Sequence, residues 1–185
     1  FINNYPEKEL NDIARYIVQC WIDGFTRANK DYRIKKTASI IVPCGMELLG
    51  RLVDNELEKI GIQCQFIVPY KVYENKQLNY DHRFDSALIL DRDYTDMAIN
   101  VYAEVVDDIQ ELIKGDAGPV CIELFGETPF SPVVKNSVLT LNKEQQELSR
   151  EMMSKTAQIY YQYYKREQNS FCIIAFPSPE IGDKF

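Results

Sequence analysis

Apolar residues recur along this chain with two alternating periods. Over residues 6–24 they are spaced three and four apart, the pattern of a helix with one buried face. Residues 37–43 instead form a short run rich in β-branched side chains, which is typical of a buried strand. The alternation continues to the end of the chain. The other predicted strands are 62–68, 87–90, 119–125 and 171–176, and the other predicted helices are 46–60, 97–114, 142–168 and a short one within 73–78.

Strands that alternate with helices of a dozen residues or more predict right-handed βαβ crossovers. Such crossovers give a mainly parallel sheet, here of about five strands, with helices on both faces. The predicted fold is therefore an α/β three-layer sandwich of the flavodoxin or Rossmann-like type, formed by residues 1–185 as one domain. The chain starts at Phe1 and stops soon after its last predicted strand. We therefore expect an N-terminal domain excised from a longer protein, in which residues 177–185 begin a linker.

Composition narrows the classes of partner. The net charge of −7 disfavours binding to nucleic acid and to anionic membrane surfaces, because both are polyanions. No apolar run approaches the roughly 20 residues that cross a bilayer. Five widely spaced cysteines without a C-x-x-C pair indicate reduced thiols rather than disulfides or a zinc knuckle, and so a cytoplasmic protein.

One stretch, "GMELLGRL" from Gly45 to Leu52, has the position of a phosphate-binding loop between a strand and a helix. Its two glycines have P-loop spacing, but the lysine and the hydroxyl residue that contact phosphate and magnesium are missing. Gly45 is therefore interpreted as the residue that lets the chain turn into the helix. No G-x-G-x-x-G motif supports a dinucleotide site.

His82 is the only histidine, so any Ser-His-Asp or Cys-His arrangement would depend on it, with Asp81 or Asp85 as the orienting carboxylate. It lies in a polar connector and no nucleophile elbow accompanies it, which favours a surface histidine. A single histidine also cannot supply the usual ligand set of a two-metal site.

Carboxylates near predicted strand ends are the remaining candidates for a ligand site. Asp91 and Asp93 follow the third predicted strand, and Glu127 follows the fourth. Ligands of open parallel sheets bind outside the carboxyl ends of the strands, so these residues and Cys44 are predicted to share a crevice. Helix caps and Asx turns explain the aspartates as well. A flavodoxin-like small-ligand-binding module therefore stays open as an alternative function.

The segment "AQIYYQYYKREQ" places four tyrosines within two turns of the last predicted helix, at Tyr160, Tyr161, Tyr163 and Tyr164. Helical spacing spreads them around the axis, so they cannot all face one core. Because aromatic residues are enriched at interfaces, they are candidates for a docking surface. The alternatives are a protein-interaction domain and a helix that simply lies in a groove of its own domain.

Three stretches resemble the N-terminal domain of the thermophilic-type metalloaminopeptidases, the aminopeptidase T and aminopeptidase S group. "KKTASIIVPCGMELLGRLVDNELEKIGIQCQFIVPY" is similar to the family's first βαβ unit, with the turn Lys59-Ile60-Gly61 in place of its K-x-G turn. "VCIELFGETPFSP" and "FCIIAFPSPEIGDKF" resemble that domain's last units, which lead to a second domain.

This resemblance implies a leucyl-type aminopeptidase that removes N-terminal residues from peptides. In that family two divalent metal ions, zinc or cobalt, are bound by Glu, His, Tyr and Asp side chains of the C-terminal domain and activate a water. None of those positions falls within residues 1–185, so no catalytic or metal residue is assigned here. The resemblance also implies that the chain helps to form the wall of the active-site cavity and supports a homodimer.

Overall fold

The computed structural model describes residues 2–69, 75–126 and 129–181. The chain forms two compact units. The first comprises Phe1–Tyr70, Glu111–Thr128 and Tyr164–Phe185, and the second comprises Lys71–Gln110 and Pro129–Tyr163. That residues 1–185 act as one domain, ending in a linker, stays a prediction.

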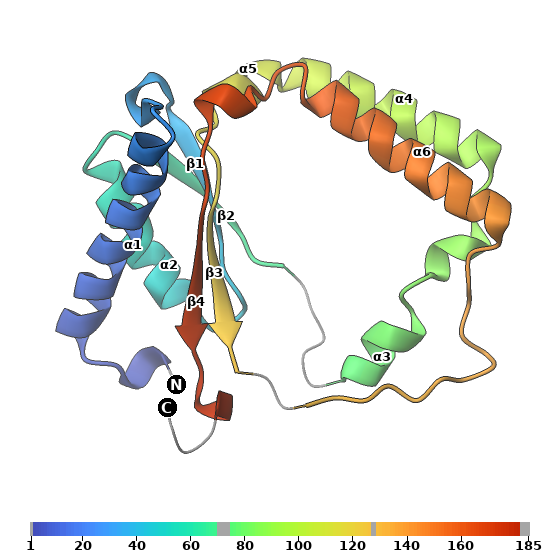
Figure 1. Ribbon diagram of the computed structural model, residues 1–185, viewed down its shortest axis with the longest axis horizontal. Helices are drawn as coiled ribbons and strands as arrows, with labels where there is room; N and C mark the ends of the chain where they lie inside the picture. The colour runs from blue at the N-terminus through green and yellow to red at the C-terminus, as the bar shows by residue number, and fades with distance from the viewer. Residues whose placement is uncertain (1, 70–74, 127–128, 182–185) are drawn as a thin grey trace. The chain divides into compact units, whose positions relative to one another are not determined.

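The first unit contains a parallel sheet of four strands in the order β2-β1-β3-β4 (Figure 1). Its strands are β1 (Thr37–Ile41), β2 (Gln63–Ile67), β3 (Val120–Phe125) and β4 (Cys172–Pro177). β1 pairs with both β2 and β3, and β3 pairs with β4, always in parallel. The predicted α/β class and mainly parallel sheet are confirmed, with four strands rather than five.

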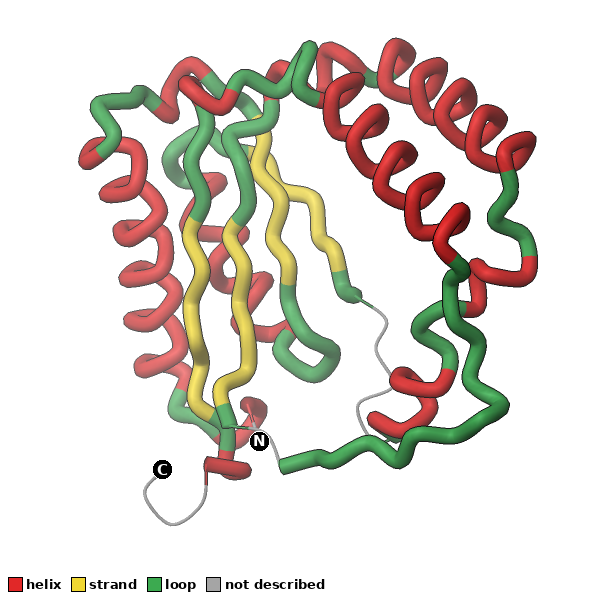
Figure 2. The backbone as a smooth tube through the Cα atoms, turned by 45° about the vertical axis from the view of Figure 1, so that its right-hand side comes forward, coloured by secondary structure: helices red, strands yellow, loops and turns green. Residues whose placement is uncertain are grey.

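Helices α1 (Glu7–Arg27) and α2 (Glu47–Glu58) lie on the same face of this sheet (Figure 2). Acidic residues Glu7 and Glu9 occupy the first turn of α1, where the helix dipole favours them. Both helices turn their apolar stripes towards the strands and form one buried core with them. The largest fully buried side chains of this core include Trp21, Phe25, Leu10, Ile17, Ile40, Leu49 and Leu57.

The two faces of the sheet differ in burial. Paired residues of parallel strands point to the same face, so Ile40, Val120 and Cys172 all point into the core shared with α1 and α2. Residues one position further along point to the opposite face. There Glu123 and Ile173 are exposed, which makes a charged residue acceptable within the central strand β3.

The second unit is helical. It contains α3 (Lys76–Asp81), the 3-10 helix η3 (Asp85–Leu88), α4 (Arg92–Asp108) and α6 (Lys143–Tyr160). A capping box of Asn142 and Gln145 begins α6, and the Gln145 side chain also donates to the carbonyls of Ala87 and Leu90. α4 and α6 run side by side in the same direction (Figure 1).

The prediction of a third strand at residues 87–90 is wrong. Residues 85–88 form η3, and Leu88 and Ile89 are exposed. Ala and Leu are helix formers, and an apolar run of four residues has no period that separates strand from helix. The Asp91 side chain then caps α4 directly behind this run.

The helix boundaries also differ from the prediction. The first helix continues past Gly24 to Arg27. The helix predicted at 97–114 begins at Arg92 and is interrupted at Ile109 before α5 (Gln110–Gly115), and the short helix lies at Lys76–Asp81. The helix predicted at 142–168 ends at Tyr160, and the 3-10 helix η4 (Arg166–Gln168) follows a turn. Three further 3-10 helices are η1 (Ile2–Asn4), η2 (Tyr32–Ile34) and η5 (Pro179–Ile181).

Candidate functional site

β1 and β3 are neighbouring strands of the first unit, and Ile40 and Ile41 at the carboxyl end of β1 pair with Val120 and Cys121 at the amino end of β3. From β1 the chain continues to β2 on one side, and from β3 it continues to β4 on the other. The strand order therefore reverses between β1 and β3, which is where open parallel sheets bind ligands. Cys44 follows β1 at this point and is exposed. The second predicted residue there, Glu127, lies outside the described residues.

The amino end of α2, next to Cys44, already holds an acidic side chain. Gly45 has a φ of 90°, as expected for a glycine that turns the chain into the helix, and its N–H donates to Glu47 Oε1 at 3.0 Å. This bond, followed by one from the N–H of Glu47 itself, lowers the pKa of the Glu47 carboxyl. Glu47 thus occupies the position that a phosphate would take in a P-loop, which agrees with the interpretation of "GMELLGRL" as a structural turn.

Glu47 is a residue of this turn that the sequence motifs do not single out. A Glu in the first turn of a helix, two residues after a glycine, is a favourable partner for free backbone N–H groups, and this much is visible in the sequence. Hydrogen bonds of Ser178 also join the residues that follow β3 and β4. The Ser178 N–H donates to Phe125 O at 2.8 Å, and Ser178 Oγ donates to Gly126 O at 2.9 Å.

Asp91 and Asp93 lie in the second unit, at the amino end of α4, and do not follow a strand. Asp91 Oδ1 accepts the N–H of Tyr94 at 2.8 Å, so its helix-cap interpretation is confirmed. The crevice predicted for Cys44, Asp91, Asp93 and Glu127 stays a prediction. Its premise that Asp91 ends a β-strand is wrong, because the strand at 87–90 does not exist.

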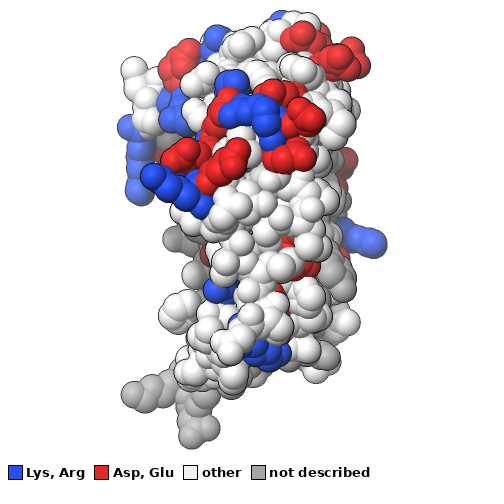
Figure 3. Space-filling view, turned by 90° about the vertical axis from the view of Figure 1, so that its right-hand side faces the viewer, with Lys and Arg blue, Asp and Glu red and all other residues white. Residues whose placement is uncertain are grey.

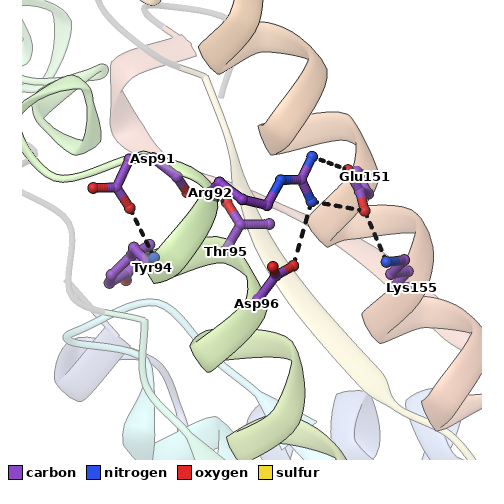
Figure 4. Close-up of polar contacts among 7 residues, drawn as sticks. All are labelled: Asp91, Arg92, Tyr94, Thr95, Asp96, Glu151 and Lys155. Carbon is purple, nitrogen blue, oxygen red and sulfur yellow. Dashed lines mark hydrogen bonds and ion pairs between the residues drawn. The ribbon is translucent and has the colours of Figure 1, made fainter.

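An ion-pair network joins α4 to α6 next to this cap (Figure 4). The Arg92 guanidinium donates to both carboxylate oxygens of Glu151, at 3.1 and 2.8 Å, and also contacts Asp96 at 3.3 Å. Lys155 Nζ lies 2.7 Å from Glu151 Oε1. Arg92, and after it Lys155, lowers the pKa of the Glu151 carboxyl to about 2. Figure 3 shows acidic and basic side chains side by side on this face of the molecule, as expected of paired surface charges.

Substituting Arg92 with Gln should raise the pKa of Glu151 towards its ordinary value. A carboxylate whose pKa is lowered in the folded state stabilises the fold at pH values above its unfolded pKa of about 4.3. That stabilisation is lost as the pH falls towards the folded pKa of about 2. We therefore expect the difference in thermal midpoint between wild type and variant to shrink over this interval. An NMR titration of the Glu151 carboxyl measures the shift directly. The matched variant Lys155→Gln should give a smaller rise, and an unchanged pKa in Arg92→Gln would contradict the assignment.

His82 pairs with Asp85, one of the two carboxylates predicted to orient it. His82 Nδ1 lies 2.9 Å from Asp85 Oδ2, and both side chains are exposed. The other carboxylate, Asp81, is held by Lys135 and by Gln77. The His82–Asp85 pair is therefore an exposed surface contact within the second unit.

The tyrosine cluster does not form a helical face. Only Tyr160 belongs to α6, and Tyr161 and Tyr163 lie in the turn that follows it. The Tyr163 hydroxyl donates to Asp107 Oδ1 at 2.7 Å, and Tyr160 and Tyr161 pack edge to face with ring centroids 5.7 Å apart. Their role, and that of Tyr164, as an interface stays a prediction.

The described residues include no group of three or more His, Cys, Asp or Glu side chains that could hold a metal ion. Within the same ranges, no helix is both long and apolar enough to cross a membrane.

No protein family model matches the sequence, and no curated protein matches it. Among solved structures, the chain is similar to wild-type AmpT from Thermus thermophilus, with a TM-score of 0.43 and 12% sequence identity. The similarity covers 94% of this chain and 37% of the AmpT chain. This chain therefore spans little more than a third of the length of that protein.

Proposed function

We propose that this chain is the non-catalytic N-terminal α/β domain of a metal-dependent, leucyl-type aminopeptidase. In this proposal the two metal ions and the residues that bind them lie in a C-terminal domain outside residues 1–185. Peptides are the substrates of the complete enzyme, and a homodimer is its assembly. The five free cysteines support a reducing compartment such as the cytoplasm.

One observation carries the proposal: the three stretches that resemble the aminopeptidase family together supply all four strands of the sheet. The first stretch, residues 35–70, contains β1, α2 and β2, which form a complete parallel βαβ unit. The second contains β3 and the last contains β4, and these two strands pair over their whole length. The resemblance therefore falls on one contiguous structural unit rather than on scattered segments.

The turn that closes α2 adds a local detail. Lys59-Ile60-Gly61 takes the place of the family's K-x-G turn, and Gly61 has a φ of 83°. The N–H groups of Gly61 and Ile62 donate back to Glu58 O and Leu57 O, so the turn ends the helix and starts β2 within a few residues.

The role of the chain in this proposal is structural. When bound in the C-terminal domain, the metal ions would supply the activated water that attacks the peptide bond. The chain contributes its parallel sheet. At the carboxyl end of this sheet Ser178 forms hydrogen bonds with the carbonyls of Phe125 and Gly126, which join the end of β4 to the end of β3. A wall held in this way would restrict access to the cavity and keep bulk water away from the bound peptide.

The test is an aminopeptidase assay on the complete polypeptide that carries this chain. We expect hydrolysis of leucyl-para-nitroanilide that a chelator abolishes and that added zinc or cobalt restores. An acetylated leucyl substrate should not be cleaved, since an aminopeptidase requires a free amino group. Absence of activity with every metal would contradict the proposal, as would activity that the chelator leaves unchanged.

A further inference from the structure

Helix α4 of the second unit exposes a row of apolar side chains. Met97, Val101 and Val105 follow one another at four-residue spacing and are 55%, 53% and 48% exposed. Residues four apart are neighbours on a helix surface, so these side chains form one continuous row. By helical spacing, the buried Val106 and Arg92, which forms the ion pair with α6, lie on the other side of the helix. The apolar row of α4 therefore faces away from α6, which lies beside it in Figure 1.

This row is a surface suited to helix packing. Single exposed apolar residues are normal on a protein surface, whereas a continuous apolar surface rimmed by polar residues is typical of an interaction site. Side chains spaced four apart form one of the ridges that pack into the groove of a partner helix. Amphipathic helices bind through positions of the same spacing. The apolar row of α4 thus has the geometry to bind one helix.

The charges around the apolar row are of one sign. Residues 93–108 contain no lysine or arginine. Their five carboxylates are those of Asp93, Asp96, Glu104, Asp107 and Asp108. Glu104 and Asp108 lie three residues after Val101 and Val105, which places them beside the row. Both are exposed, and neither forms an ion pair with another residue of the described ranges, so their charges are available to a partner.

Charge decides which kind of helix fits here. An acidic helix would be repelled, and a neutral one would leave the carboxylates without partners, so the complementary helix carries lysines or arginines beside its apolar face. A second copy of this chain does not meet that requirement. Among the α-helices that the structure describes, none has more lysines and arginines than aspartates and glutamates. The occupant must therefore come from a different sequence.

We propose that α4 binds a basic amphipathic helix of another protein through Met97, Val101 and Val105. The apolar face of that helix packs on the row, and its lysines or arginines lie beside Glu104 and Asp108. Burial of apolar surface supplies most of the affinity, and the charges set the orientation and accelerate association. The net charge of −7 adds a field that attracts such a helix.

Fluorescence anisotropy with a labelled synthetic peptide tests this interface. The probe is a peptide of about 18 residues with leucines on one helical face and lysines elsewhere, and its control has the same composition in an order without an apolar face. We expect the 185-residue chain to bind the probe at least about 10-fold more tightly than the control. Binding should weaken in about 1 M salt, where the screening length is about 3 Å. Equal binding of both peptides, or no binding, would overturn the proposal.

Apolar substitutions locate the binding surface. Val101→Ser combined with Val105→Ser removes apolar surface without adding charge and should weaken binding of the probe by about 10-fold or more. The matched control combines Ile34→Ser with Ile173→Ser, two side chains of the first unit that are 59% and 56% exposed, and should bind like wild type. Wild-type affinity in the first variant, or an equal loss in the control, would overturn the proposal.

Charge substitutions test the rim of the row. Glu104→Gln combined with Asp108→Asn should weaken binding of the probe by about 5-fold and reduce its dependence on salt. Glu9→Gln combined with Glu58→Gln removes the same charge from exposed positions of α1 and α2 and should have a smaller effect. Equal losses in the two variants would assign the effect to net charge alone and would overturn the proposal. Circular dichroism checks that every variant is folded.

The complete polypeptide that carries this chain separates the possible sources of the helix. We expect it to bind the probe as tightly as the 185-residue chain does. Loss of binding in the complete polypeptide would show that its own residues cover the apolar row, and would overturn the assignment to another protein. None of these measurements involves peptidase activity, so this interface and the proposed function can fail separately.

Discussion

Replacing Gly118 with alanine should lower the free energy of unfolding by at least about 3 kcal/mol. Gly118 has a φ of 106°, and a Cβ added there would lie 1.9 Å from the backbone oxygen of Ser170. That oxygen cannot rotate away as a side chain would. The backbone at Ser170 would have to move, although its N–H donates to Ala117 O at 3.1 Å directly before β4 begins. The substitution should therefore disturb the start of the β3-β4 pair.

Gly45 offers a matched control for this experiment. Its φ of 90° is also positive, but no atom lies within 4 Å of the position that a Cβ would take. Gly45→Ala should therefore cost only the conformational strain of about 1–2 kcal/mol. Urea denaturation of both variants, followed by circular dichroism, measures the difference. Equal losses at the two positions would show that the contact with Ser170 is not the cause.

Replacing Trp21 with alanine should cost about 3–5 kcal/mol of unfolding free energy. Trp21 is completely buried in the core between α1 and the sheet. Its ring packs against Phe25 and Tyr32, with centroids 4.8 and 5.6 Å away, so the truncation leaves a cavity lined by aromatic rings. Thermal and urea unfolding of the variant measure the loss.

Two further variants identify the source of that loss. Trp21 Nε1 is buried without a hydrogen-bond partner among the described residues, so Trp21→Phe gives up packing volume but no hydrogen bond. We expect it to be clearly less harmful than Trp21→Ala. Leu112→Ala changes a side chain that is 66% exposed and should alter stability by less than about 0.5 kcal/mol. A Trp21→Ala variant as stable as Leu112→Ala would contradict the described core.

The sheet could largely be predicted from the sequence because its strands combine β-branched residues with nearby Gly or Pro. The runs before Pro43 and after Gly118 are of this kind and became β1 and β3. The run at 87–90 has only one β-branched residue and leads into the Asp91 cap, and it became part of a helical segment. Four apolar residues alone do not distinguish these outcomes.

The end of α6 depends on contacts that are distant in sequence. Lys30 Nζ donates to the carbonyls of Arg166 and Asn169, at 2.8 and 2.6 Å, and holds these residues in a path that is not an α-helix. The Asn169 side chain donates to Asp116 O at 2.6 Å. Local periodicity contains no information about either bond, so the prediction continued the helix to residue 168.

Of the candidate site residues, the sequence predicted the position of Cys44 correctly, because that position depends only on the order of strands and helices. Cys44 does follow β1 at the point where the order reverses, because that position follows from the βαβ pattern alone. Asp91 was assigned to the wrong kind of element, since one aspartate can end a strand or cap a helix with the same neighbours in sequence. The place of Glu47 in the first turn of a helix is visible in the sequence, but the positive φ of Gly45 and the hydrogen bond from its N–H to Glu47 are seen only in the structure.

The central proposal is that this chain supports a peptidase whose chemistry lies elsewhere in the polypeptide. The most direct test compares leucyl-para-nitroanilide hydrolysis by the complete polypeptide and by the 185-residue chain, each with zinc and with cobalt. The account predicts metal-dependent activity in the complete polypeptide and none in the 185-residue chain. Metal-dependent activity in the 185-residue chain, or no activity in either, would contradict it.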